Sequence, residues 1–245
     1  MKKIAVVLSG CGVFDGAEIN EAVLTLLALE ERGIAYQCFA PDKPQLHTIN
    51  HLKGEDKEQA RNVLEESARI VRGSVSALSE LDEQEFSALI IPGGFGVAKN
   101  LSTFATDGAD FSIDVEFQQV MTAFASKKKP VGYMCIAPVL LPKVYNGVRC
   151  TIGYDEETAS VINSLGGLHV DCTVDNIVVD NDYNVVTTPA YMLAGSIADA
   201  KKGIDKLVEG FEVQRNESVR LEGYLSVFNE IYYYLAPFLY MHYYL

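Results

Sequence analysis

The sequence is poor in basic residues, with 20 lysines and arginines against 33 aspartates and glutamates and a formal charge of −13. Nucleic-acid-binding proteins need a basic surface that neutralises phosphates, and proteins that adhere to anionic membranes use clusters of lysine and arginine. The excess of acidic residues argues against both kinds of basic surface. We therefore expect no nucleic-acid partner and no membrane partner.

Paired cysteines are absent as well. The five cysteines are scattered and include no C-x-x-C pair, which is neither a disulfide framework nor a zinc pattern. The four histidines form no cluster that would support a metal site, so no metal is expected. The apolar run after Met1-Lys2-Lys3 is too short for a signal-peptide core. These absences predict a cytoplasmic protein with reduced thiols.

Short β-rich apolar segments alternate with segments of helical period along most of the chain. Strands are expected at residues 4–8, 35–40, 88–92, 131–134, 149–153, 177–179 and 185–188. Helices are expected at residues 19–32, 63–70, 114–126, 158–165 and about 193–209. Such alternation is typical of a parallel sheet covered on both faces by helices. No linker rich in proline, glycine or serine divides the chain, so one domain is expected.

The last 22 residues, Tyr224–Leu245, differ because they hold nine aromatic side chains. The apolar run within this stretch is too short, and the stretch is too rich in tyrosine, to span a bilayer, which takes roughly 20 apolar residues. Tyrosine, with an apolar ring and a polar tip, is favoured on packed surfaces and at interfaces. We expect a helix that packs on the domain or on a second subunit.

Three loops follow expected strands: residues 10–16, 93–96 and 135–138. In open parallel sheets, ligands bind outside the carboxyl ends of the strands. The three loops are therefore expected to converge on one crevice. This convergence, rather than any single motif, predicts a functional site.

Cys135 ends an apolar strand, and Pro138 follows three residues later. A side chain at a sharp strand-to-helix turn is presented at the sheet edge beside helix-start amides, which lower the pKa of a thiol. This reading makes Cys135 a reactive thiolate. The same pattern also fits a buried, inert cysteine, because free cysteine packs as a small apolar residue.

Gly93 and Gly94 follow another expected strand. Consecutive glycines let backbone N–H groups approach a ligand closely, as an oxyanion hole requires. A plain tight turn is the alternative. The loop has neither the spacing of a phosphate-binding Walker loop nor that of a dinucleotide fingerprint.

Glu18 and Glu21 lie one turn apart at the start of the first expected helix. Either carboxylate could hold or move the proton of Cys135, although acidic residues are also favoured there by the helix dipole. Cys11 follows the end of the first expected strand, just as Cys135 follows the end of a later one. If those two strands are neighbours, Cys11 is a candidate redox partner.

Six stretches of the chain together resemble one known family. They are Leu8–Ile19, Cys38–Asp42, Arg61–Leu64, Ile91–Ser102, Met134–Pro138 and Val186–Met192. The set closely resembles the ElbB glyoxalase family, in the ThiJ/PfpI branch of the class I glutamine amidotransferase-like superfamily. The resemblance implies an amidotransferase-like domain at residues 1–213, followed by an aromatic-rich, helical extension at residues 214–245.

The resemblance implies an α/β fold, a flavodoxin-like three-layer sandwich with a mostly parallel central sheet and a nucleophile elbow at Cys135. It also implies a catalytic glutamate on the first helix, 12 residues before the glycine that ends it. Counting back from Gly33 selects Glu21, with Glu18 as second choice. The candidate oxyanion and binding residues are Gly93, Gly94, Phe95, Asn100 and Ile136.

The activity that the resemblance implies is cofactor-free conversion of glyoxal, and of methylglyoxal, to a 2-hydroxy acid through a Cys135 hemithioacetal. Deglycase activity is a related alternative. The substrate would be a small dicarbonyl or aldehyde, and a homodimer is expected. Amidases of the superfamily carry histidine where this chain has Ile136, which argues against peptidase activity. The alternative function is a non-enzymatic redox-sensing or partner-binding protein linked to isoprenoid metabolism.

Overall fold

The computed structural model describes residues 2–211. The predicted extension, residues 214–245, lies outside the described residues, so its helix and the boundary before it stay predictions.

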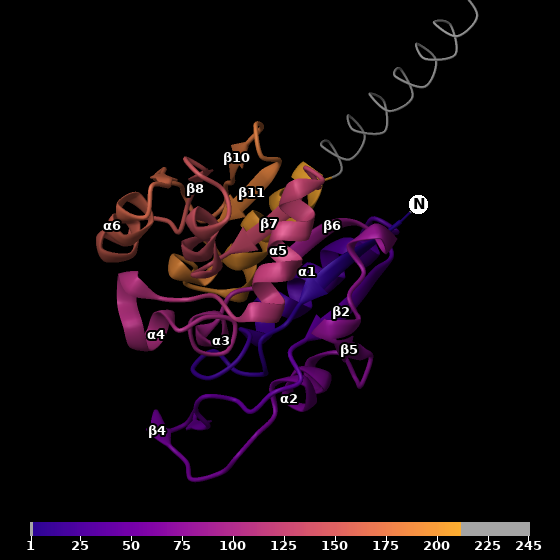
Figure 1. The fold of residues 1–245 in the computed structure, drawn as a ribbon, viewed down its shortest axis with the longest axis vertical. Helices are drawn as coiled ribbons and strands as arrows, with labels where there is room; N and C mark the ends of the chain where they lie inside the picture. Colours follow the sequence, from indigo (N-terminus) through magenta and orange to yellow (C-terminus); the bar gives the residue numbers. More distant parts are fainter. Residues whose placement is uncertain (1, 212–245) are drawn as a thin grey trace, which may run out of the picture. The chain divides into compact units, whose positions relative to one another are not determined.

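A seven-stranded sheet in the order β10-β11-β7-β6-β1-β2-β5 forms the centre of the fold (Figure 1). All neighbouring strands pair in parallel except β10, which runs antiparallel to β11. The strands are β1 (Lys3–Val7), β2 (Tyr36–Ala40), β5 (Val75–Ala77), β6 (Phe86–Ile91), β7 (Val131–Met134), β10 (Val178–Asp180) and β11 (Val185–Thr188). Two small sheets pair β3 (Ile49–Asn50) with β4 (Glu55–Asp56) and β8 (Arg149–Cys150) with β9 (Leu168–His169).

Helices cover both faces of the large sheet. The α-helices are α1 (Ile19–Glu31), α2 (Val63–Ile70), α3 (Phe95–Lys99), α4 (Phe104–Asp107), α5 (Val115–Ser126), α6 (Glu156–Ser164) and a helix over residues 197–211. The 3₁₀ segments are η1 (Leu78–Glu80), η2 (Glu83–Glu85), η3 (Gly108–Asp110), η4 (Ala137–Lys143) and η5 (Ala190–Met192).

Successive side chains along a central strand pack into two separate hydrophobic cores, one on each face of the sheet. Ala5 and Val7 of β1 pack in the core that contains the apolar residues of α5 and η4. Ile4 and Val6, which point the other way, pack with α1, α2 and the helix over residues 197–211. A strand buried on both faces is what a covered parallel sheet requires. The predicted three-layer α/β sandwich is confirmed.

The segment after Cys135 is the main local departure from expectation. The predicted α-helix is instead the 3₁₀ segment η4, in which the Val139 N–H donates to the Ile136 carbonyl at 3.1 Å. Pro138 is tolerated in the first turn, but Pro142 inside the segment lacks the N–H group that an α-helix needs there. The β segment predicted over residues 149–153 is also shorter, because β8 ends at Cys150.

Candidate active site

Cys135 sits at a strained turn directly after β7. Its φ is +59°, a left-handed conformation that non-glycine residues rarely adopt. The Cys135 N–H donates to the Thr188 carbonyl on the neighbouring strand β11 at 3.1 Å, which holds the turn in place. A non-glycine residue in this conformation between a strand and a helical segment is the nucleophile-elbow geometry that was predicted.

The Glu21 carboxyl lies against the Cys135 thiol and is fully buried. Its Oε2 accepts the Gly93 N–H at 2.8 Å, and its Oε1 accepts the Tyr191 N–H at 3.1 Å. The remaining contact is a side-chain hydrogen bond with the Cys135 thiol. Loops from three strand ends therefore meet around one carboxyl–thiol pair.

Burial determines the proton equilibria of this pair. It raises the pKa of Glu21 to about 7, aided by the nearby Glu18 charge and opposed by the two amide hydrogen bonds. Burial also raises the pKa of the Cys135 thiol well above its usual value, and the charge of Glu21 adds to this. The prediction of a lowered thiol pKa is therefore wrong. Desolvation and a neighbouring carboxylate outweigh the amides.

Two backbone amides face the Cys135 sulfur, those of Gly94 and Ile136. This pair has the arrangement of an oxyanion hole. The Gly93 amide, which was predicted to share that role, is instead committed to Glu21. Gly93 matters through its missing side chain, since a Cβ there would lie 2.4 Å from the Cβ of Cys135.

Glu18 has a different task from Glu21. It is the N-cap of α1, and its Oε2 accepts the Glu21 N–H at 2.6 Å. The Glu18 N–H donates to the Gly93 carbonyl at 2.9 Å. Glu18 thus ties the start of α1 to the Gly93 loop, and Glu21 is the carboxyl that touches the thiol.

Cys11 and Cys135 do not meet the condition set for a redox pair. Strands β1 and β7, which precede them, are separated in the sheet by β6. Both cysteines are free thiols, and the charged groups that act on Cys11 are Glu66, Arg69, Asp15 and Arg61 rather than Glu21.

The two further predicted binding residues differ in accessibility. Phe95 is 49% exposed, and its N–H donates to the Val13 carbonyl at 2.8 Å. Asn100 is buried, and its amide nitrogen donates to the carbonyls of Ser9 and Asp15 at 2.8 and 2.9 Å. Asn100 therefore joins loops beneath the site, whereas the Phe95 ring is open to solvent.

Sequence reasoning missed the turn after β11. This turn supplies the Tyr191 amide to Glu21, and the Asn20 side chain holds it on α1 by donating to the Tyr191 hydroxyl at 3.2 Å. The expected strand at residues 185–188 was a usable signal for this turn. Strand β11 pairs in parallel with β7, so its carboxyl end lies at the same edge of the sheet as Cys135.

Within residues 2–211, no three histidine, cysteine or acidic side chains group closely enough to hold a metal ion. No helix in that same range is long and apolar enough to cross a membrane.

No family model matches the chain. Two curated mitochondrial relatives are each 46% identical to it. The rat ES1 protein homolog (Rattus norvegicus) matches over 84% of this chain and 82% of its own length. The human glutamine amidotransferase-like class 1 domain-containing protein 3 (Homo sapiens) matches over 84% and 81%. A crystal structure from Ehrlichia chaffeensis, described as an isoprenoid biosynthesis protein with amidotransferase-like domain, has a TM-score of 0.81 at 38% identity and covers 87% of this chain and 99% of its own.

These relatives overturn the predicted cytoplasmic location, because both curated names specify mitochondria. Unpaired cysteines argue against an oxidising compartment, but they do not identify the cytoplasm among the others. At this level of identity and coverage, the chain belongs to the ElbB/ES1 family of class I glutamine amidotransferase-like proteins.

Proposed function

We propose that this protein converts glyoxal, and methylglyoxal, to the corresponding 2-hydroxy acid without a cofactor, with Cys135 as nucleophile and Glu21 as proton shuttle. The observation that carries the proposal is the contact of one sulfur with two kinds of group. The Cys135 sulfur contacts the Glu21 carboxyl, whose pKa is about 7, and it also contacts the backbone amides of Gly94 and Ile136.

In the first step, the ionised Glu21 carboxylate takes the thiol proton while the sulfur adds to one aldehyde carbon. A C–S bond forms, and the C=O π pair becomes an alkoxide beside the Gly94 and Ile136 amides. The alkoxide then takes the proton from Glu21 and becomes a neutral hemithioacetal. A base with a pKa near 7 can both accept and return a proton at neutral pH.

In the second step, the Glu21 carboxylate removes the proton from the carbon bound to sulfur, and the neighbouring carbonyl becomes an enediolate. The hydroxyl proton on the sulfur-bearing carbon passes to the neighbouring oxygen, and Glu21 returns its proton to the neighbouring carbon. The product is a thioester of the 2-hydroxy acid, an isomer of the hemithioacetal. Water then cleaves the C–S bond, which releases glycolate or lactate and restores the thiol. No oxidant or reductant is consumed.

Glutamine hydrolysis is less well supported by the site. The residue after the nucleophile is Ile136, and two of the three histidines among residues 2–211 have other partners. His169 accepts the Ile152 N–H at 3.3 Å, and His51 accepts the Phe14 N–H at 3.2 Å. A redox-sensing role is also less well supported, since sensor cysteines are accessible and have a low pKa, whereas Cys135 is 7% exposed.

The test is turnover of glyoxal by the full chain without glutathione, followed as glycolate formation. We expect Cys135→Ala to abolish turnover and Glu21→Gln to reduce it at least about 100-fold, the usual range for general acid–base catalysis. Cys172→Ala, which removes a cysteine outside the site, is the matched control. Equal turnover by the wild type and Cys135→Ala would refute the proposal. Release of amines from preformed glycated peptides, after free glyoxal is scavenged, would indicate a deglycase instead.

A further inference from the structure

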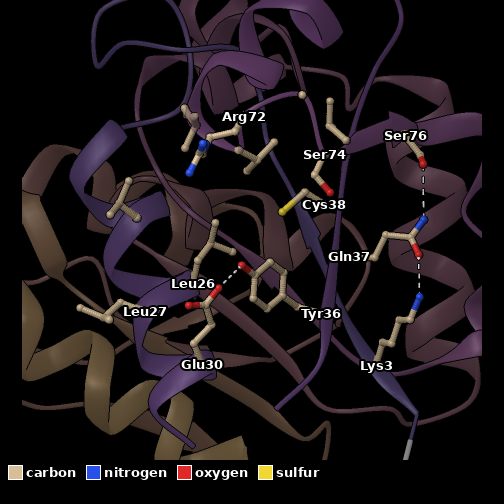
Figure 2. Close-up of a pocket in the computed structure, with 15 residues that line it drawn as sticks. Lys3, Leu26, Leu27, Glu30, Tyr36, Gln37, Cys38, Arg72, Ser74 and Ser76 are labelled. Carbon is tan, nitrogen blue, oxygen red and sulfur yellow. Dashed lines mark hydrogen bonds between the residues drawn. The ribbon is translucent and has the colours of Figure 1, made fainter. Parts of the chain in front are cut away.

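A second candidate site lies away from Cys135, on the face of the sheet that α1 and α2 cover. A cavity of about 650 Å³ opens between these helices and strands β2 and β5 (Figure 2). This volume is within the range of roughly 300–1,000 Å³ that small-molecule sites occupy. No residue of the candidate active site lines the cavity.

Apolar side chains from both helices form much of the cavity wall. They are Val23, Leu26, Leu27, Ile70 and Val71. Val23 and Leu27, which lie one turn apart on α1, are 46% and 39% exposed. The space stays open because α2 ends at Ile70 and the chain turns back toward β5. A bound molecule would remove these side chains from water.

The turn that ends α2 places an arginine at the cavity. The Gly73 N–H donates to the Ala68 carbonyl at 2.8 Å, which closes the helix end, and Arg72 occupies the left-handed position with φ +55°. Glycine is usual at this position because a side chain is strained there. Arg72 is exposed, and it has no hydrogen-bond or ion-pair partner among residues 2–211.

The other charged groups of the cavity are already engaged. The Lys3 ammonium donates to the Gln37 side chain at 3.3 Å. The Tyr36 hydroxyl donates to Oε1 of Glu30 at 2.7 Å. Figure 2 shows Arg72 and the Glu30–Tyr36 pair at different ends of the cavity. Arg72 is thus the charged lining residue without a hydrogen-bond partner among residues 2–211, and the Glu30 carboxylate lies at the other end of the cavity.

We propose that this cavity binds a small amphipathic carboxylate, with its apolar body against Leu26 and Leu27 and its carboxylate on the Arg72 guanidinium. A planar guanidinium pairs with a carboxylate through two parallel hydrogen bonds. Glu30 repels an anion at the opposite end, so it fixes the direction in which the ligand enters. The Glu30 carboxylate repels a phosphate dianion more strongly than it repels a single negative charge, which favours a carboxylate ligand.

Calorimetric titration of the full chain with eight-carbon probes tests the proposal. We expect octanoate to bind more tightly than octanol, octylammonium or octyl phosphate. Arg72→Gly should weaken octanoate binding about tenfold, because it removes the charge-assisted pairing with the carboxylate at a partly exposed site, and should leave octanol binding unchanged. Leu27→Glu, which adds a negative charge at the wall, should also weaken octanoate binding.

Lys128→Gly is the matched control. Lys128 has φ +50° at the end of α5, where the Lys129 N–H donates to the Phe124 carbonyl at 3.0 Å. Both glycine variants relieve the same backbone strain, so neither should lower the unfolding midpoint, and only Arg72→Gly should lose octanoate. Equal octanoate affinity in the wild type and Arg72→Gly, or no octanoate binding by the wild type, would overturn the proposal. Tighter binding of octyl phosphate would overturn the carboxylate assignment.

Discussion

The Gly93 amide nitrogen lies 2.8 Å from Oε2 of Glu21, and the same glycine leaves room for Cys135. A Cβ at Gly93 would lie 2.4 Å from the Cβ of Cys135 and 2.7 Å from Oε2 of Glu21. One residue therefore orients the carboxyl through its N–H and admits the thiol through its missing side chain. The close contact between thiol and carboxyl depends on that glycine.

Gly93→Ala should abolish turnover of glyoxal and lower the unfolding free energy by about 1–3 kcal/mol, the usual cost of overpacking. The new Cβ would clash with the Cβ of Cys135, which is fixed by the backbone, so no side-chain rotation can relieve the clash. Gly195→Ala is the control, because a Cβ there meets nothing within 4 Å. Activity and urea unfolding of both variants provide the measurement. A fully active Gly93→Ala protein would show that the packing of this pair is not required.

Alkylation of Cys135 by iodoacetamide should speed up as pH rises from 6 to 8, with an inflection near 7. The Glu21 carboxylate accepts the thiol proton, and its pKa is about 7. Glu21→Gln should remove this inflection and slow alkylation about 100-fold. Glu18→Gln can still accept the Glu21 N–H and should keep an inflection, moved to lower pH because the Glu18 charge helps raise the pKa of Glu21. If Glu21→Gln kept the same pH profile, Glu21 would not be the base.

Local sequence patterns were sufficient to predict several elements at their observed bounds. Helix α2 begins at Val63 because the Asn62 side chain caps it, accepting the N–H groups of Leu64 and Glu65. The apolar β-rich runs of β7 and β11 also coincide with the predicted strands. The convergence of the site loops could also be predicted, because the carboxyl ends of parallel strands lie at the same edge of a sheet.

Other properties of the site depend on three-dimensional packing. The interposition of β6 between β1 and β7, which separates Cys11 from Cys135, is a matter of strand order. The direction of the thiol pKa depends on how deeply Cys135 is buried and on its contact with Glu21. The amide of Tyr191 binds Glu21 through the backbone, and a backbone donor has no residue-specific signature in the sequence.

Glu21 should make the stability of the protein fall as pH rises. Its pKa rises from 4.5 to about 7 on folding, so between these values the folded protein holds a proton that the unfolded chain releases. The contribution is full below about 4.5 and is lost as pH passes 7, a change of about 3 kcal/mol. Glutamine cannot titrate, so the stability of Glu21→Gln relative to the wild type should increase between pH 5 and pH 8. Urea unfolding at both pH values measures this, with exposed Glu116→Gln as control.

The left-handed turn at Cys135 should carry a measurable strain. A φ of +59° is a strained backbone conformation for any residue with a Cβ, whereas glycine adopts it without strain. Cys135→Gly should therefore be more stable than Cys135→Ala by up to about 1 kcal/mol, although both lack the nucleophile. Chemical unfolding of the two variants at one pH provides the comparison. Greater stability of the alanine variant would contradict a strained elbow.

The hydrogen bond from Asn20 to the Tyr191 hydroxyl should tune the Glu21 proton. It anchors the turn whose Tyr191 N–H stabilises the Glu21 carboxylate and opposes the rise in its pKa. Tyr191→Phe should loosen this turn and weaken the amide bond, moving the inflection of Cys135 alkylation to higher pH by about half a unit. Tyr183→Phe, whose hydroxyl donates to the Asn146 carbonyl elsewhere, is the control. A purely structural role for Tyr191 would lower stability and leave the inflection where it is, whereas a positioning role moves the inflection itself.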